Sequence, residues 1–433
     1  MSLLTVLPFS LNPELPGRHG GDGRASAEVE STVTDIIRTV VERGDEALCA
    51  LTRRFDDWSP SDASELEVSA QERERALATV PAETRRLLAT AAKRIRRFHE
   101  PQLQSGFTIS DPHDVRLQQR IVPLGRAGLY VPGGTAAYPS SVLMNAIPAQ
   151  VAGVREIVMT TPTPGGAINP VVIAAAVEAG VHRIFKIGGA QAVAALAYGT
   201  NVVPRVDKIV GPGNAWVATA KRQVFGAVDI DSIAGPSEVL IVADETADPA
   251  LVAADLLAQA EHDVLASAGL ITTDPRLIEQ VERELELQLS RLSRRAIAIT
   301  SLRTYGFAIV APDRGSALDL ANVIATEHLE LLLEDPASAA EAIENAGAIF
   351  VGPWTPEALG DYLAGPNHVL PTGGTARFFS GLGVQDFVKR VNVLRFTEAG
   401  FREVAELTTR FAELEGLDAH AASVAIRVGK ESP

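Results

Sequence analysis

The middle of the chain alternates between short apolar runs and longer stretches whose apolar residues recur at helical spacing. The short runs predict strands at 156–160, 183–187, 207–210, 238–242, 270–272 and 348–351. The longer stretches predict helices at 170–179, 190–198, 215–225, 249–261 and 275–294. Strands that alternate with helices form parallel sheets with helices on their faces. We therefore predict an α/β fold built from two incomplete Rossmann-like, doubly wound domains.

Both ends of the chain have patterns typical of helices. Residues 28–100 are mostly amphipathic, which predicts helices that pack on one of the two α/β domains. Their apolar stripe is formed by Val33, Ile36, Ile37, Val40 and Val41. The tail from Glu398 to Lys430 is also predicted to be helical. We divide the chain into an N-terminal arm at 1–27, an α/β domain at 28–129 with 237–381, a second α/β domain at 130–236, and a helical tail at 382–433.

Composition and charge narrow the class of protein further. The 433 residues suffice for two or more domains, and contents of 46% apolar and 21% charged residues are typical of soluble globular proteins. The net charge of −15 argues against a nucleic-acid partner. No apolar run reaches the roughly 20 residues that cross a membrane, and Met1–Ser10 lacks the basic start of a signal peptide. The single cysteine, Cys49, excludes an internal disulfide, fits a cytoplasmic location, and leaves N and O ligands for any metal.

Three glycine-rich loops follow or lie near predicted strand ends, at 131–135, 188–191 and 211–214. Ligands bind at the carboxyl ends of strands in open parallel sheets, and glycine lets the backbone approach them closely. The dinucleotide fingerprint is incomplete, because Trp216 occupies the place of its third glycine. Each loop alone could be a tight turn between a strand and a helix. Three such loops in consecutive units favour a bound nucleotide.

Four residues from distant segments form a candidate metal-ligand set: Gln259, His262, Asp361 and His420. Gln259 and His262 are three residues apart in a predicted helix, so both point from one face. Imidazole nitrogen combined with amide and carboxylate oxygen suits zinc or manganese. Each residue also has a simpler interpretation. Single histidines are more often buried hydrogen-bonding groups, and Gln259 and Asp361 fit exposed helix positions.

Glu327 and His328 form a candidate acid–base pair. Two adjacent side chains on a helix diverge by about 100°. The pair can therefore act together only at the end of an element or in a loop. A charge pair at the end of a helix is the alternative interpretation.

Six motifs, in order and with compatible spacing, resemble histidinol dehydrogenase over residues 28–427. They are Gly211-Pro-Gly-Asn214, Ala234-Gly-Pro-Ser-Glu238, Gln259-Ala-Glu-His262, Glu327-His328-Leu329, Gly365-Pro-Asn-His-Val-Leu-Pro-Thr372 and Glu415-Gly-Leu-Asp-Ala-His420. The resemblance implies an oxidoreductase of histidine biosynthesis that converts L-histidinol through L-histidinal to L-histidine and reduces two NAD+. It also implies one Zn²⁺ per subunit, with Mn²⁺ as a possible substitute, and a homodimer whose active sites are shared.

The same resemblance, carried over motif by motif, implies roles for individual residues and segments. The implied zinc ligands are Gln259, His262, Asp361 and His420. The implied substrate contacts are Ser237, Gln259, His262, His328, Asp361, Glu415 and His420. The implied NAD contacts are Tyr130, Gln191 and Asn214. Glu327 and His328 would be the catalytic acid/base residues. By this resemblance the domain at 130–236 binds NAD, the domain at 28–129 with 237–381 carries the metal and catalytic residues, and the tail mediates dimerisation.

Two other functions fit parts of the sequence. A paralogous zinc- and NAD-dependent dehydrogenase on the same fold would act on another small alcohol, such as a sulfonated diol. Glu415 argues against an anionic substrate, because a carboxylate there suits a cation and repels a sulfonate. The other alternative is a non-enzymatic nucleotide- or metal-binding protein with a decayed site. The intact set of ligands and bases argues against it.

Overall fold

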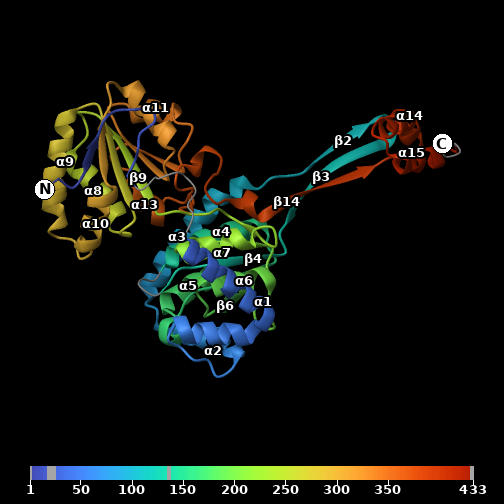
Figure 1. The fold of residues 1–433 in the computed structure, drawn as a ribbon, viewed down its shortest axis with the longest axis horizontal. Coiled ribbons are helices and arrows are strands. Elements are labelled where there is room, and N and C mark those ends of the chain that lie inside the picture. The colour runs from blue at the N-terminus through green and yellow to red at the C-terminus, as the bar shows by residue number, and fades with distance from the viewer. Residues whose placement is uncertain (1, 17–25, 134–137, 430–433) are drawn as a thin grey trace. The chain divides into compact units, whose positions relative to one another are not determined.

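A computed structural model describes residues 2–16, 26–133 and 138–429 of the chain (Figure 1). The chain divides into two compact units. The first unit comprises Met1–Gln102 with Leu124–Phe387, and the second comprises Leu103–Pro123 with Val388–Pro433. The predicted α/β class is confirmed, since the first unit contains two parallel sheets flanked by helices. Among the described residues, no helix is both long and apolar enough to cross a membrane.

One sheet of the first unit has five parallel strands in the order β6-β5-β4-β7-β8. The strands are β4 (Arg126–Tyr130), β5 (Glu156–Thr160), β6 (Arg183–Phe185), β7 (Lys208–Val210) and β8 (Asp229–Ile230). The helices of this segment are α4 (Pro139–Ala152), α5 (Pro170–Glu178), α6 (Gly189–Tyr198) and α7 (Ala215–Val224). The order reverses next to β4, so the carboxyl ends of β4 and its neighbours lie where open α/β sheets bind ligands.

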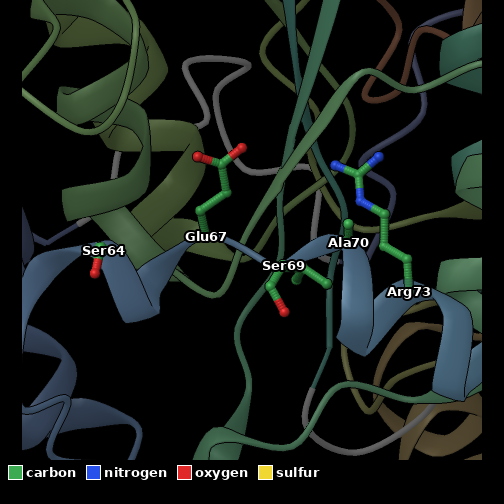
Figure 2. Close-up of a pocket in the computed structure, with 6 residues that line it drawn as sticks. Ser64, Glu67, Ser69, Ala70 and Arg73 are labelled. Carbon is green, nitrogen blue, oxygen red and sulfur yellow. The ribbon is translucent and has the colours of Figure 1, made fainter.

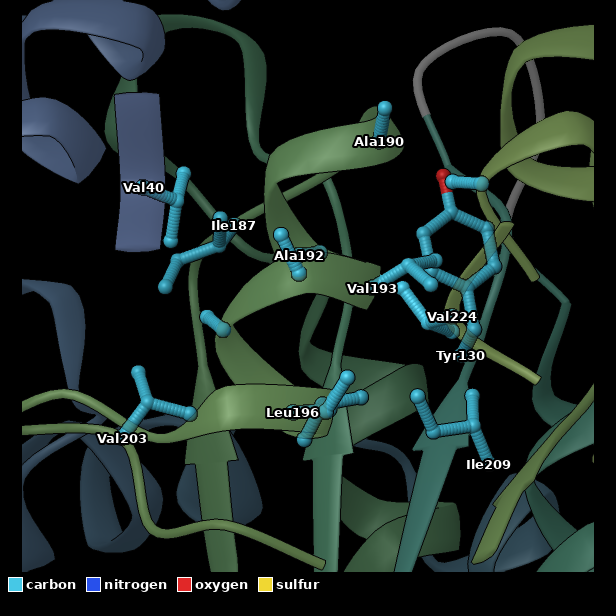
Figure 3. Close-up of a cluster of buried hydrophobic side chains, with 14 of the residues drawn as sticks. Val40, Tyr130, Ile187, Ala190, Ala192, Val193, Leu196, Val203, Ile209 and Val224 are labelled. Carbon is cyan, nitrogen blue, oxygen red and sulfur yellow. The ribbon is translucent and has the colours of Figure 1, made fainter. Parts of the chain in front are cut away.

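The N-terminal helices pack mainly against this segment. They are α1 (Ala27–Phe55), α2 (Ala70–Thr79) and α3 (Ala82–His99), and they contact α4, α5, α6 and α7. The sequence grouped 28–129 with 237–381 instead, and its boundary at 129/130 falls inside β4. The contacts differ because the apolar stripe of α1 meets the alanine- and valine-rich face of α6. Figure 3 shows Val40 of α1 directed toward Ile187 in this core.

The prediction that the stripe faces the core is wrong for one of its residues. Val33, Ile36 and Val40 are buried and Ile37 packs against them, whereas Val41 is 54% exposed. Adjacent helical positions point about 100° apart, so Val41 faces away when Val40 faces the core.

The other sheet of the first unit has six parallel strands in the order β1-β11-β10-β9-β12-β13. The strands are β1 (Thr5–Leu7), β9 (Glu238–Ala243), β10 (Ser267–Thr272), β11 (Phe307–Val310), β12 (His328–Leu332) and β13 (Ala348–Val351). The helices are α8 (Pro249–Ala260), α9 (Pro275–Leu289), α10 (Arg295–Tyr305), α11 (Arg314–Ile324), α12 (Pro336–Glu341) and α13 (Glu357–Tyr362). The predicted helix at 275–294 is therefore two helices, since Ser290 is the C-cap of α9 and Arg294 the N-cap of α10.

Helices cover both faces of this sheet, as the doubly wound prediction requires (Figure 1). Successive residues of a strand point to opposite faces. On β9, Val239 and Ile241 join a core with α8, α9 and α10, and Leu240 and Val242 join a second core with α11 and α12. Every residue of β9 and β12 is buried, so their polar side chains need internal partners.

The second unit is an antiparallel sheet followed by two helices. Its strands, in the order β14-β3-β2, are β2 (Phe107–Asp111), β3 (Val115–Pro123) and β14 (Val388–Arg395), and its helices are α14 (Glu398–Leu414) and α15 (Asp418–Ala425). The helical prediction for the tail is right for α14 and α15 but wrong for 388–395. The valine-rich stretch of β14 pairs with β3 along its whole length. Short 3-10 turns complete the fold at 63–66, 100–102, 112–114, 164–166, 375–377, 384–387 and 426–428.

Candidate active site and metal centre

Glu327 and His328 lie at the amino end of β12, beside the start of β9. His328 is the first residue of β12, so the prediction that this pair sits at the end of an element is confirmed. Both side chains are buried. Two adjacent polar side chains are thus placed where the amino ends of β9 and β12 meet.

Glu238 connects the two residues through hydrogen bonds. The Glu238 N–H donates to Glu327 Oε2 at 3.0 Å, and the Glu327 N–H donates to Glu238 Oε1 at 3.3 Å. His328 Nδ1 lies 3.2 Å from the main-chain oxygen of Glu238. Glu238 Oε1 also accepts the N–H of Gly373 at 3.1 Å. Neighbouring strands and the loop at 371–374 are therefore joined at one buried carboxylate.

Burial shifts the protonation of both candidate catalytic groups. It raises the pKa of Glu327 well above its usual value, because the charged carboxylate loses its hydration. It lowers the pKa of His328 to about 3, and nearby His368 and His262 act in the same direction. His328 is therefore a neutral imidazole near pH 7. Its Nε2 has no hydrogen-bond partner among the described residues, which leaves this atom available for a substrate.

Three side chains gather into a candidate metal centre. One ligand atom each from His262, Glu357 and Asp361 lies within 4.8 Å of the others. Gln259 is fully buried, and neither its amide oxygen nor its amide nitrogen has a partner within the described ranges. An imidazole, carboxylates and an orphaned amide form an N/O donor set that suits Zn²⁺ or Mn²⁺. The residues present therefore fit a metal.

Helix ends place these ligands. Gln259 lies in the last turn of α8, and His262 follows the helix, with its N–H donating to the Gln259 carbonyl at 3.2 Å. Glu357 and Asp361 lie four residues apart on α13, so both point from one face. The sequence prediction missed Glu357. This i, i+4 spacing to Asp361 was the signal that could have found it.

Glu330 of β12 holds the start of α13 through a hydrogen bond. Its Oε1 accepts the N–H of Glu357, the first residue of α13, at 2.7 Å. Burial, followed by the neighbouring Asp255, raises the pKa of Glu330 to about 9. Glu330 is thus a neutral carboxyl near pH 7, because burial disfavours its charged form.

The second unit carries the fourth predicted metal ligand, His420, and the predicted substrate contact Glu415. Glu415 is the C-cap of α14, and His420 lies in the first turn of α15. Both line a hollow of about 540 Å³ together with Phe411 and Leu417. The predicted site residues are therefore divided between the two units of the chain.

The predicted NAD contacts lie along the five-stranded sheet. The Tyr130 hydroxyl, at the end of β4, accepts the N–H of Gly189 at 3.1 Å, and burial raises its pKa to about 12. Gln191 is buried in the first turn of α6. Asn214 is the N-cap of α7, where its side-chain oxygen accepts two main-chain N–H groups. Of the loop at 131–135, residues 134 and 135 lie outside the described part of the chain.

Ser237 immediately precedes β9 and lies beside Glu327, where a hydrogen bond from its side chain favours the ionised carboxylate and offsets part of the rise in the pKa of Glu327 that burial causes. The main-chain oxygen of Ser237 also accepts the N–H of Ser267. Its hydroxyl is thus held next to the candidate catalytic carboxylate.

A hollow of about 410 Å³ lies elsewhere in the first unit, between η1 (Ala63–Leu66) and α2 (Figure 2). Its charged side chains already have protein partners. Glu67 pairs with Arg183 at 2.6 Å, and Arg73 donates to the carbonyl of His182 at 2.8 Å. This hollow is structural rather than a second candidate site.

The parallel sheets, the buried Glu327–His328 pair and the N/O cluster together define an α/β protein with a candidate catalytic centre beside a candidate metal centre. The chain belongs to the histidinol dehydrogenase family, whose profile matches residues 22–428. Histidinol dehydrogenase of Geobacter sulfurreducens is 57% identical over 401 residues, which is 93% of this chain and 94% of that protein. The protein of the same name from Lactococcus lactis is 49% identical over 94% of this chain and 95% of its own length. The crystal structure of histidinol dehydrogenase from Elizabethkingia anophelis superposes with a TM-score of 0.90, at 34% identity and 99% coverage of both chains.

Proposed function

We propose that this oxidoreductase converts L-histidinol through L-histidinal to L-histidine and reduces two NAD+ as a homodimer. The observation that carries the proposal is the buried, neutral His328: its Nε2 has no hydrogen-bond partner among the described residues, and its Nδ1 lies 3.7 Å from Glu327 Oε2. An imidazole must be unprotonated, and therefore neutral, before it can accept a proton from the substrate. The single cysteine, Cys49, supports a cytoplasmic location.

His328 and Glu327 divide the proton transfers of the two oxidations. In the first, His328 Nε2 accepts the hydroxyl proton of histidinol while a hydride passes from the same carbon to NAD+. The aldehyde must then add water before a second hydride can leave. Glu327, once ionised, accepts a proton from that water, since a raised pKa makes its carboxylate a stronger base than an exposed one, and His328 again receives a proton as the second hydride leaves.

The candidate metal centre would hold the substrate rather than react with it. Gln259, His262 and Asp361 would bind the ion together with His420 of the partner subunit, and Glu357 is near enough to join them. A bound Zn²⁺ or Mn²⁺ would hold the imidazole and amine of histidinol in place. Ser237 and Glu415 of the partner subunit would contact the substrate, and Glu415 would pair with its ammonium group.

Tyr130, Gln191 and Asn214 would hold NAD+ at the carboxyl ends of the five-stranded sheet. Support comes from Gly211, whose φ is +116° and where a Cβ atom would lie 2.1 Å from the Tyr130 carbonyl oxygen. Only glycine allows this close approach. It brings the Gly211–Asn214 loop against Tyr130.

A coupled assay of product and metal tests this function. Purified protein is given L-histidinol or a sulfonated diol with NAD+, before and after chelation and after re-addition of Zn²⁺ or Mn²⁺. The expected result is two NADH per histidinol, loss of activity with the metal, and recovery with Zn²⁺. His262→Asn should lose metal, while the exposed His113→Asn serves as the matched control. NADH formation from the diol and not from histidinol would contradict the proposal.

A further inference from the structure

We propose that Glu238 is the positioning residue of the catalytic pair: it fixes the tautomer of His328 and the orientation of Glu327. The inference rests on the proposed function for the identity of the pair. Glu238 begins β9, is buried, and is the parallel-strand neighbour of the Glu327–His328 step. No role was assigned to it from the sequence.

The main-chain oxygen of Glu238 determines which nitrogen of His328 carries the proton. A carbonyl oxygen can only accept a hydrogen bond, so Nδ1, at 3.2 Å, must be the donor. The carboxylate oxygens of Glu327 and Glu357 nearest to Nδ1 are both 3.7 Å away, beyond hydrogen-bonding distance. A neutral imidazole has one N–H, so the lone pair is on Nε2. This is the atom that must accept the substrate proton.

The rest of Glu238 holds Glu327. Its N–H donates to Glu327 Oε2 at 3.0 Å, which orients the side chain. Its Oε1 accepts the Glu327 N–H at 3.3 Å, which fixes the backbone just before His328. The same Oε1 accepts the N–H of Gly373 at 3.1 Å. One residue therefore sets the start of β12 against both β9 and the loop at 371–374.

Because of these contacts, two substitutions can distinguish whether Glu238 acts by positioning its neighbours or by its negative charge. The N–H groups of Glu327 and Gly373 both donate to Oε1, and glutamine keeps an acceptor oxygen at that place. Leucine has similar size but no acceptor, so it removes the acceptor of the buried Glu327 N–H and of the Gly373 N–H, and it releases the Glu327 backbone. Positioning thus predicts that Glu238→Gln retains function and that Glu238→Leu does not.

The first test reads the tautomer directly in the resting wild-type protein. Protein labelled with 15N in its histidines is studied by NMR at pH 7, and His328→Asn identifies the His328 signal. The expected chemical shifts show a protonated Nδ1 and an unprotonated Nε2. A protonated Nε2 would overturn the inference. This result needs no turnover, so it stands apart from the proposed function, which fails if wild-type protein makes no NADH from histidinol.

The second test compares the two variants in each half-reaction, from histidinol and from histidinal. Glu238→Leu is expected to lower kcat about 10²-fold in both, as a misplaced catalytic group does, with metal content and the KM for NAD+ unchanged. Its His328 shifts should move toward a mixture of tautomers. Glu238→Gln should keep kcat within about threefold of wild type and retain the Nδ1–H signal. Equal losses of kcat in Gln and Leu variants would assign the effect to charge and overturn the inference.

Discussion

Asp56 carries a buried carboxylate oxygen that has no hydrogen-bond partner among the described residues. Burial raises the pKa of this carboxyl from 3.8 to about 6. As the pH rises through 4, the unfolded chain gives up this proton while the folded protein keeps it until about pH 6. Ionisation therefore costs the native state stability between pH 4 and 6, and the loss stays constant above pH 6.

Asp56→Asn is expected to remove that loss, since asparagine does not ionise. The variant should be more stable than wild type by about 1–3 kcal/mol at pH 8 and close to wild type at pH 4. Urea unfolding of both proteins at the two pH values measures the difference. The adjacent, exposed Asp57→Asn is the control and should show no such pH dependence. A variant less stable than wild type at pH 8 would contradict this account.

Gly347 lies where the backbone passes close to the catalytic pair. A Cβ atom there would lie 2.5 Å from the main-chain oxygen of Glu327, which already accepts the N–H of Ala348. Gly347→Ala must therefore displace Glu327, and we expect kcat to fall by about 10².

Gly315→Ala is the matched control, because Gly315 is exposed in α11 and alanine favours a helix. It should keep wild-type kcat in the NADH assay. Wild-type kcat in Gly347→Ala would show that the Glu327 backbone tolerates displacement.

The sequence predicted the position of the candidate catalytic pair better than the members of the candidate metal cluster. Adjacent Glu327 and His328 can cooperate only at the end of an element, and β12 begins there. Glu357 was missed because a single acid in a short helix is usually solvated. Its burial depends on β12 and α8, which are distant in sequence. Glu238 was missed for a related reason: its carboxylate accepts hydrogen bonds from main-chain N–H groups, whose positions a motif does not reveal.

At the scale of elements, a buried hydrogen bond anchors the start of α13. Glu330 Oε1 holds the first N–H of this six-residue helix, which carries Glu357 and Asp361. We predict that Glu330→Leu frees the start of α13 and lowers zinc occupancy several-fold at limiting metal, since second-shell partners typically affect affinity 10- to 100-fold. Metal analysis after dialysis against a weak chelator measures the change.

Glu330→Gln is the control for that prediction, because its amide oxygen can accept the same N–H. It should retain metal close to the wild-type level. Equal metal loss in both variants would show that α13 is not anchored through this hydrogen bond.

Most strands of the parallel sheets followed from local pattern. The ranges predicted for β5 and β13 match the structure, because each is a short apolar run. β12 escaped prediction because it begins with polar residues whose burial depends on Glu238 and α13. β14 escaped because its pairing partner, β3, lies on the far side of the first unit in sequence. The apolar pattern of a segment shows which face of a strand is buried, but it does not show which distant strand will pair with it.

At the scale of the whole molecule, the tail has little core of its own. Leu407, Phe411 and Leu414 of α14 are largely exposed. Since an amphipathic helix needs a partner for its apolar face, we propose that this tail docks on a second subunit and completes its site. A His420→Asn subunit then has an intact first unit and a defective tail. A His262→Asn subunit has a defective first unit and an intact tail.

Two such inactive proteins, refolded together, should recover up to about a quarter of wild-type activity, because half the dimers are mixed and one of their two sites is intact. Gel filtration and mass spectrometry confirm that mixed dimers form. Activity that stays at the level of the parents in proven mixed dimers would place the tail in the site of its own subunit.

The pairing of β3 with β14 also matters while the protein is being made. β2 and β3 emerge from the ribosome early, but the edge of β3 that β14 covers stays open until Leu124–Phe387 has been translated. At about 5–20 residues per second that interval is roughly 15–50 s. A two-stranded ribbon with exposed Phe107 and Ile109 is then a target for chaperones and for pairing with nascent neighbours. The yield of active enzyme should therefore depend on chaperone supply more than the stability of the finished protein would indicate.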